Sequence, residues 1–153
     1  MRNKYLSLFI ILAITFLASG IGGFITNTYK EPWYSGILSP SISPPDWVFA
    51  PVWSTLYFMM ALAAWLAWIN NFKKDLLLIY YVHLIFNALW SVIFFGLHEI
   101  LFALIDLGII VLFIIYLMKR YFQTFKTSFY LMVPYFCWSC YAFLLNFLIY
   151  RIN

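Results

Sequence analysis

Five long apolar segments, separated by short polar turns, restrict this chain to a narrow choice of folds. The first segment, residues 5–27, exceeds the roughly 20 residues that a helix needs to cross a bilayer. Inside a bilayer every backbone N–H and C=O group needs a protein partner, so each segment is expected to be an α-helix. Only 9% of the residues are charged, against about 25% in soluble domains. The sequence therefore predicts an all-α integral membrane protein that crosses the membrane several times.

We predict one domain over residues 1–153, a bundle of five transmembrane helices with a long loop between the first two helices. The helices are expected at about residues 5–27, 47–69, 76–97, 100–118 and 128–150. Residues 5–27 also allow a second interpretation as a signal peptide, because Arg2 and Lys4 precede the run. The apolar run continues past the poor cleavage site Ala18-Ser19-Gly20, so we expect a retained helix.

Small residues and prolines mark the first helix and the loop that follows it. Ala18 and Gly22, like Ser19 and Gly23, lie four residues apart and permit another helix to approach closely. Such a stripe usually packs inside a bundle and less often forms a dimer face. The loop holds four helix-stopping prolines: Pro32, Pro40, Pro44 and Pro45. Asp46 follows them and is expected to cap the second helix.

The basic residues are interpreted as markers of orientation rather than of nucleic-acid binding, although the net charge is +4. Five spans place seven of them on one side of the membrane: Arg2, Lys4, Lys73, Lys74, Lys119, Arg120 and Lys126. The last three are expected in a turn over residues 119–127. The other side holds only Lys30 and Arg151. For a bacterial plasma membrane, this asymmetry predicts a cytoplasmic N-terminus, with the long loop and the C-terminus facing outward.

Polar and aromatic side chains recur at helical spacing on three of the predicted helices. The faces hold Trp53, Tyr57, Met60, Ala61 and Ala64; His83, Asn87, Trp90 and Phe94; and Tyr135, Trp138, Ala142, Leu145 and Asn146. At about 1.5 Å rise per residue, these residues fall in the half of the membrane below the long loop. Any one ring has ordinary core packing as its alternative. The set as a whole predicts an aromatic pocket for a flat hydrophobic ligand.

Other motifs carry weaker signals. Asp106 is expected to be satisfied inside the bundle, and a proton relay would have only His83 as a second member. Cys137 and Cys140 have the spacing of a redox pair, but they lie mid-helix, whereas activated thiols lie at partly exposed helix N-termini. The sequence shows no metal-binding cluster, phosphate loop or Ser/His/Asp array.

Three stretches resemble the translocator protein, or tryptophan-rich sensory protein, family (TspO/MBR, the peripheral benzodiazepine receptor family). They are Trp33-Tyr34 with residues 39–57 (SPSISPPDWVFAPVWSTLY), residues 87–96 (NALWSVIFFG), and Pro134-Tyr135 with Trp138, Ala142 and Leu145-Asn146. The resemblance implies a five-helix bundle, commonly a homodimer. It also implies binding of porphyrins such as protoporphyrin IX, sterols and benzodiazepine-like compounds in a pocket closed by the first loop.

Carried over by motif, the ligand-binding positions are Tyr34, Trp53, Tyr57, Asn87, Trp90, Phe94, Trp138, Ala142 and Asn146. Some bacterial members of the family are reported to degrade protoporphyrin in light, and the tryptophans implicated correspond to Trp53 and Trp138. The chain departs from the family where Ser39-Pro40-Ser41-Ile42 replaces Lys-Pro-x-Trp. The sterol pattern near Leu145 lacks its tyrosine, so cholesterol is not expected as the natural ligand.

The leading hypothesis is therefore a membrane receptor or carrier for protoporphyrin IX or a related tetrapyrrole, with no covalently bound cofactor. Asn87 and Asn146 are candidate donors to a propionate or a carbonyl. Expected partners are the ligand, membrane lipid and a second copy of the chain, with no nucleic acid. The alternatives are a light- and oxygen-dependent porphyrin-degrading enzyme that uses Trp53 and Trp138, or a transporter or stress-signalling regulator of tetrapyrrole levels.

Overall fold

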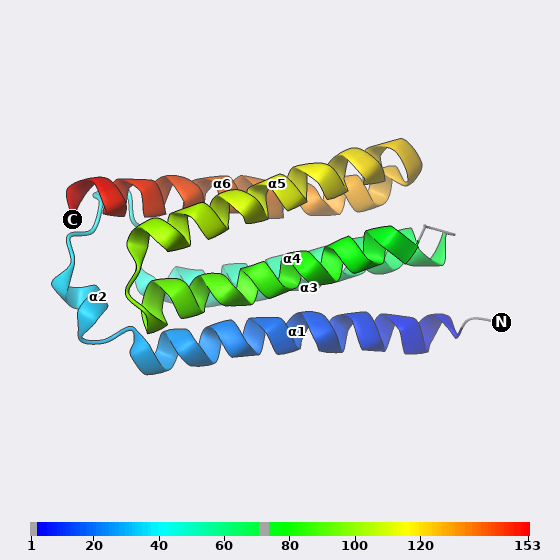
Figure 1. The fold of residues 1–153 in the computed structure, drawn as a ribbon. Helices are drawn as coiled ribbons and strands as arrows, with labels where there is room; N and C mark the ends of the chain where they lie inside the picture. The colour runs from blue at the N-terminus through cyan, green and yellow to red at the C-terminus, as the bar shows by residue number, and fades with distance from the viewer. Residues whose placement is uncertain (1–2, 71–73) are drawn as a thin grey trace.

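The computed structural model describes residues 3–70 and 74–153 and confirms the all-α architecture in that part of the chain (Figure 1). Five of its helices are long and apolar enough to cross a membrane. The long helices are α1 (Lys4–Tyr29), α3 (Phe49–Ile69), α4 (Lys74–Ser91), α5 (Ile100–Thr124) and α6 (Lys126–Ile152). Three short elements accompany them: α2 (Trp33–Gly36), a 3₁₀ turn (Asp46–Val48) and a π-helical turn (Val92–Gly96).

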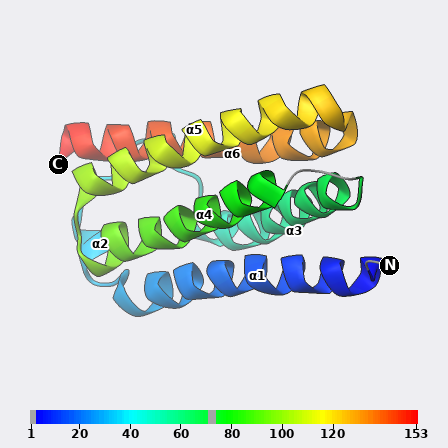
Figure 2. The same cartoon turned by 45° about the vertical axis from the view of Figure 1, so that its right-hand side comes forward.

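The five long helices pack in a ring. Helix α1 packs against both α3 and α4, α4 packs against α5, α5 against α6, and α6 returns to α3. Figures 1 and 2 show α3 and α4 as a middle layer, with α1 on one side of it and the α5–α6 pair on the other. Because the ring closes, each long helix has two neighbours, and a space can form among all five.

The two ends of the bundle differ in charge. Helix α2, the C-terminus and the α4–α5 connection lie at one end, whereas α1 begins and α5 ends at the other (Figure 1). Lys4, Lys74, Lys119, Arg120 and Lys126 all lie in the turns of helix next to the second end. Arg2 and Lys73 lie outside the described residues. The bundle thus places the described basic residues where the predicted topology requires, while the side of the membrane that this end faces remains a prediction.

Two local predictions were wrong. Helix α5 continues to Thr124 rather than ending near Met118, so Lys119 and Arg120 belong to the helix and not to a turn. Lysine and arginine favour helices, and their long stems let the charged groups reach the interface. Asp46 does not cap α3, because its carboxylate accepts a hydrogen bond from the Lys30 ammonium.

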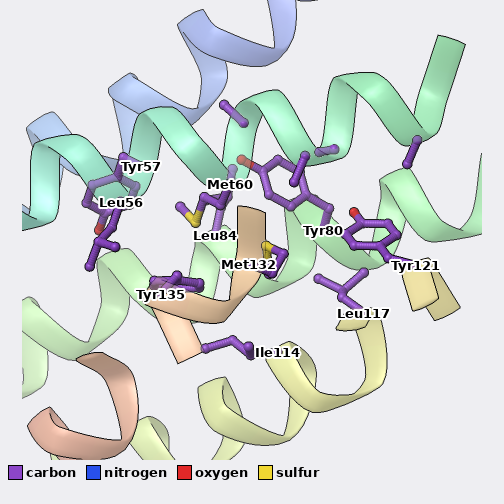
Figure 3. Close-up of a cluster of buried hydrophobic side chains, with 14 of the residues drawn as sticks. Leu56, Tyr57, Met60, Tyr80, Leu84, Ile114, Leu117, Tyr121, Met132 and Tyr135 are labelled. Carbon is purple, nitrogen blue, oxygen red and sulfur yellow. The ribbon is translucent and has the colours of Figure 1, made fainter. Parts of the chain in front are cut away.

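The hydrophobic core fills the half of the bundle nearer the start of α1. Figure 3 shows its centre, where Met60, Tyr80, Leu117, Met132 and other side chains from four helices meet. Small side chains make the close packing of α3 possible. Ala61, Ala63, Ala64 and Ala67 are all buried on it. The side chains in this half are closely packed, whereas the cavity described below lies in the half beneath the loop.

The end of α4 widens into a π-helical turn. The Leu97 N–H donates to the Val92 carbonyl at 2.9 Å, a spacing of five residues rather than four. Phe94 and Phe95, though consecutive, are both buried within the turn. A regular helix would point two neighbouring side chains about 100° apart. The π turn therefore lets both rings contribute to the interior beneath the loop.

Candidate functional site

A cavity of about 540 Å³ lies among the helices in the half of the bundle below the loop. Its volume falls within the usual range for small-molecule sites, about 300–1,000 Å³. All five long helices and α2 contribute to its walls. Eight of the predicted ligand-binding residues line it: Tyr34, Trp53, Tyr57, Asn87, Trp90, Phe94, Ala142 and Asn146. The structure thus brings together side chains that lie more than a hundred positions apart in the sequence.

Trp138, the ninth predicted residue, lies behind the cavity wall. It does not line the cavity, and its ring centroid lies 6.5 Å from that of Trp53, with the ring planes 82° apart. Phe49 and Tyr141 flank the indole, with centroids at 6.1 and 5.3 Å. Trp138 thus contacts two residues that line the cavity, Trp53 and Phe49, without lining it itself. Any role of Trp138, as assigned by resemblance, would therefore be exerted through a neighbouring ring.

Aromatic rings form one end of the cavity. Trp90 and Phe94 stack at a centroid distance of 5.1 Å with only 14° between their planes. Tyr34 of α2 meets Phe95 and Phe94 edge-on, at 5.7 and 6.3 Å. Offset and edge-on pairs of this kind hold each other in fixed orientations. Ring contacts therefore hold α2, in the loop, against the π-helical turn at the end of α4.

The floor of the cavity is a chain of hydrogen bonds across three helices. The Tyr57 hydroxyl on α3 donates to Asn87 Oδ1 on α4. The Asn87 amide donates to the Tyr135 hydroxyl on α6 at 2.7 Å, and that hydroxyl lies 2.7 Å from His83 Nε2. The Tyr135 hydroxyl has one hydrogen and two lone pairs, so it can either donate to His83 Nε2 or accept from it, depending on the tautomer of His83. In both cases the chain of hydrogen bonds joins α3, α4 and α6 through Asn87 and Tyr135.

A second polar link joins α4 to α6 higher in the cavity. The Trp90 indole N–H donates to Asn146 Oδ1 at 3.1 Å, and the Asn146 amide donates to the Ile100 carbonyl at 3.1 Å. An amide group carries two N–H donors, and these bonds use one from Asn146, as the floor uses one from Asn87. Both asparagines are thus held in place by the protein before any ligand contact.

The charged residues that line the cavity lie at its mouth. Lys30, at the end of α1, pairs with Asp46 at the start of the second membrane segment, and its Nζ lies 5.0 Å from the centre of the Tyr34 ring. Burial raises the pKa of the Tyr34 phenol above its ordinary value, and the nearby Asp46 carboxylate acts in the same direction. Tyr34 is therefore a neutral hydrogen-bonding group at physiological pH.

The loop over the mouth is held by residues near the C-terminus. Asn153 bonds to Leu38 in both directions, accepting from its N–H at 2.8 Å and donating to its carbonyl at 3.0 Å. Tyr141 donates to the Ile42 carbonyl at 2.6 Å. Three backbone groups of the loop thus find partners on α6 or at the residue that follows it.

Helix α1 contributes to the cavity in a way that its sequence did not predict, because its small residues indicate helix packing alone. Ser19, Gly23 and Thr26 line the cavity along one face of that helix, and Lys30, directly after it, continues this face. A Cβ at Gly23 would meet nothing within 4 Å, whereas one at Gly22 would lie 3.1 Å from Ser91 Oγ. The stripe therefore does two things: Gly22 permits close contact with α4, and Gly23 leaves room in the cavity. The three- and four-residue spacing was the available signal.

Two further groups that the sequence singled out lie away from the cavity. Asp106 is buried inside the bundle, as expected, and its Oδ2 has no hydrogen-bond partner among the described residues. The expectation of a neutral or hydrogen-bonded carboxyl stays a prediction. Cys137 and Cys140 are free thiols on α6. Neither the carboxyl nor the thiols line the cavity.

Comparison with known proteins decides the family. The model of the TspO/MBR family matches residues 9–151, nearly the whole chain. The chain belongs to the TspO/MBR family. The expectation drawn from the three sequence stretches is thereby confirmed.

Relatives within the TspO/MBR family come from archaea, bacteria and animals. The chain is 35% identical to the Tryptophan-rich protein TspO of Archaeoglobus fulgidus, over 96% of this chain and 94% of that one. It is 35% identical to the Tryptophan-rich sensory protein of Cereibacter sphaeroides, over 93% and 91%. It is 30% identical to the human Translocator protein, over 90% and 86%. The similarity therefore spans the entire fold, including every helix that lines the cavity.

Proposed function

We propose that this chain is a multi-pass membrane receptor for flat, hydrophobic, porphyrin-like ligands, which bind in the cavity beneath the loop. One observation carries the proposal: eight of the nine residues that the sequence motifs predict to bind a ligand line a single cavity. They come from α2, α3, α4, the π-helical turn and α6. In a bacterial plasma membrane, the basic end of the bundle would face the cytoplasm and the cavity would open toward the outside.

The walls suit a macrocycle. Trp53 and the stacked pair Trp90 and Phe94 offer ring faces and edges on separate helices. Each aromatic contact adds about 0.5–1.5 kcal/mol beyond the burial of its apolar area. Ala142, which also lines the cavity, has a small side chain that leaves room for a ligand. A planar ligand can therefore bury both of its faces here without the polar groups of the floor being left unpaired.

The test is a titration of the purified protein in a neutral detergent with protoporphyrin IX, followed by quenching of tryptophan fluorescence. Trp53→Phe should weaken binding about fivefold, the equivalent of one lost aromatic contact of about 1 kcal/mol. Trp68→Phe is the matched control, because Trp68 lies in the last turn of α3 at the other end of the bundle. Equal loss of affinity in both variants would show that the ligand does not bind in this cavity.

A second candidate function, light- and oxygen-dependent degradation of the bound porphyrin, is favoured by the placement of the two tryptophans. Trp53 lines the cavity, and the ring centroid of Trp138 lies 6.5 Å from that of Trp53. If Trp53 gives an electron to the light-excited porphyrin, Trp138 is close enough to donate an electron to Trp53. Under illumination in air, bleaching of the porphyrin absorption band should slow in Trp53→Phe and in Trp138→Phe, and not in Trp68→Phe. Identical bleaching rates in all three variants would leave binding as the only function supported.

A further inference from the structure

Charge is confined to one point of the cavity. Among the described residues that line it, only Lys30 and Asp46 carry a formal charge. Their ammonium and carboxylate groups contact each other at the mouth, where the end of α1 meets the start of the second membrane segment. All other polar lining groups are neutral amides, hydroxyls or backbone atoms. Among the described lining residues, this pair is therefore where a charged ligand would meet a full charge.

The two partners are not equally tied to the protein. The Lys30 side chain is only 22% exposed and its ammonium also lies 5.0 Å from the centre of the Tyr34 ring, whereas the Asp46 side chain is 64% exposed. If the pair separates, Asp46 can be hydrated in place at little cost. Lys30 would lose its counter-ion while remaining at the mouth beside the aromatic ring, an arrangement that favours a new anion. Exposed ion pairs contribute only about 0–1 kcal/mol, so exchange of one carboxylate for another is easily reached.

We infer that Lys30 selects ligands that carry a carboxylate, and that Asp46 occupies its ammonium group until such a ligand arrives. This inference rests on the proposed function, since it concerns the polar edge of a ligand whose apolar body lies between Trp53 and Trp90. The incoming carboxylate takes the place of the Asp46 carboxylate on Lys30. The released Asp46 carboxylate is then hydrated by solvent. No proton or covalent bond changes hands, and the net charge of the mouth falls by one with each ligand carboxylate bound.

The inference distinguishes two porphyrins that share one macrocycle and differ only at the ends of two side chains. Protoporphyrin IX carries two propionic acids, which are ionised at neutral pH, whereas its dimethyl ester carries two uncharged methyl esters in their place. Replacement of Lys30 by methionine keeps the stem of the side chain and removes only its charge. Lys30→Met should weaken diacid binding about tenfold, as expected for a lost charge-assisted hydrogen bond, and leave ester binding unchanged.

Each variant is compared with the unaltered protein for the same ligand in the same neutral detergent, so the partition of the ligand into micelles cancels. Lys126→Met is the control for net charge, because Lys126 lies at the opposite end of the bundle. It should affect neither ligand. Equal weakening of diacid and ester by Lys30→Met would overturn the inference, since it would show that Lys30 only supports the shape of the mouth.

The Asp46→Asn variant tests whether the Asp46 carboxylate competes with the ligand for Lys30 or instead holds the loop in place. Removal of the competing carboxylate should tighten diacid binding about threefold and leave ester binding unchanged, given the small net value of an exposed pair. If Asp46→Asn weakens diacid binding instead, the pair holds the loop and the inference is wrong. If the unaltered protein binds the ester and Lys30→Met does not change the affinity for the diacid, this inference is wrong and the proposed function still stands. Failure of both porphyrins to bind would remove both.

Discussion

Asn87 is the residue whose replacement tests the structure most directly. Its amide is the only link between Tyr57 on α3 and Tyr135 on α6 among the hydrogen bonds of the described residues. Asn87→Leu keeps the approximate size of the side chain and removes both bonds. Tyr135 retains its bond to His83, whereas the Tyr57 hydroxyl, on a side chain that is 7% exposed, loses its acceptor. The variant therefore leaves one buried donor unpaired.

The size of the effect follows from these contacts. Side-chain hydrogen bonds between membrane helices contribute about 0.6 kcal/mol on average and up to about 1.7 kcal/mol. Two such bonds, one of which leaves an unpaired hydroxyl, predict a loss of about 1–3 kcal/mol in the free energy of unfolding. Tyr57→Phe removes only the first bond and should cost about 0.6–1.7 kcal/mol. In a Tyr57→Phe background, Asn87→Leu should cost less, because no donor is left unpaired.

The assay is unfolding in mixed micelles with increasing SDS, followed by tryptophan fluorescence, for both single variants and the double variant. The predicted coupling between positions 57 and 87 is about 0.6–1.7 kcal/mol. Tyr81→Phe supplies the matched control: Tyr81 is half-buried on α4, nearly two turns from Asn87, and should combine additively with Asn87→Leu. Full additivity of Tyr57→Phe and Asn87→Leu would refute the hydrogen-bonded floor.

Two further predictions concern α1 and the loop. Gly22→Leu should lower the free energy of unfolding by about 1–3 kcal/mol in the same assay, because even a Cβ at this position would lie 3.1 Å from Ser91 Oγ. Gly23→Ala should leave stability unchanged, because a Cβ there would meet nothing within 4 Å. Similar costs at both positions would contradict the close approach of α1 and α4. Asn153→Ala removes both bonds to Leu38 and should speed amide hydrogen exchange at Leu38 about tenfold, measured by mass spectrometry, with Ser7→Ala at the far end as control. An unchanged exchange rate would mean that the C-terminus does not hold the loop.

Periodicity made much of the cavity predictable. Residues at spacings of three and four lie on one face of a helix, and polar groups in a membrane helix face the protein interior. These two rules were enough to bring Trp53, Asn87 and Asn146 together from three helices. The number and approximate positions of the five long helices followed from hydropathy and the polar turns, because a membrane-spanning segment must satisfy its own backbone, whereas the end of α5 did not.

Features that depend on contacts between segments could not be predicted in this way. The carboxylate of Asp46 has two possible uses, as a helix cap or as a partner for a distant cation, and only the fold brings Lys30 within reach. The π turn at Phe94 leaves no periodic signal, because it is a single insertion in one turn of helix. Whether a small residue such as Gly23 faces a neighbour or an empty space is likewise decided by the partner helix.

The division of the bundle into a solid half and a hollow half bears on how a ligand could be sensed. Tyr57 belongs to both halves: it packs in the core cluster, and its hydroxyl forms the cavity floor with Asn87. The floor is tied across α3, α4 and α6, so it resists movement. The loop above the cavity is held by the ring contacts of α2 and by two hydrogen bonds from Asn153, all near the surface. A ligand that displaces Asp46 from Lys30 therefore changes a contact at the mouth, beside the loop, and none of the floor. The loop, rather than the helix packing, is the element whose equilibrium such a ligand can shift.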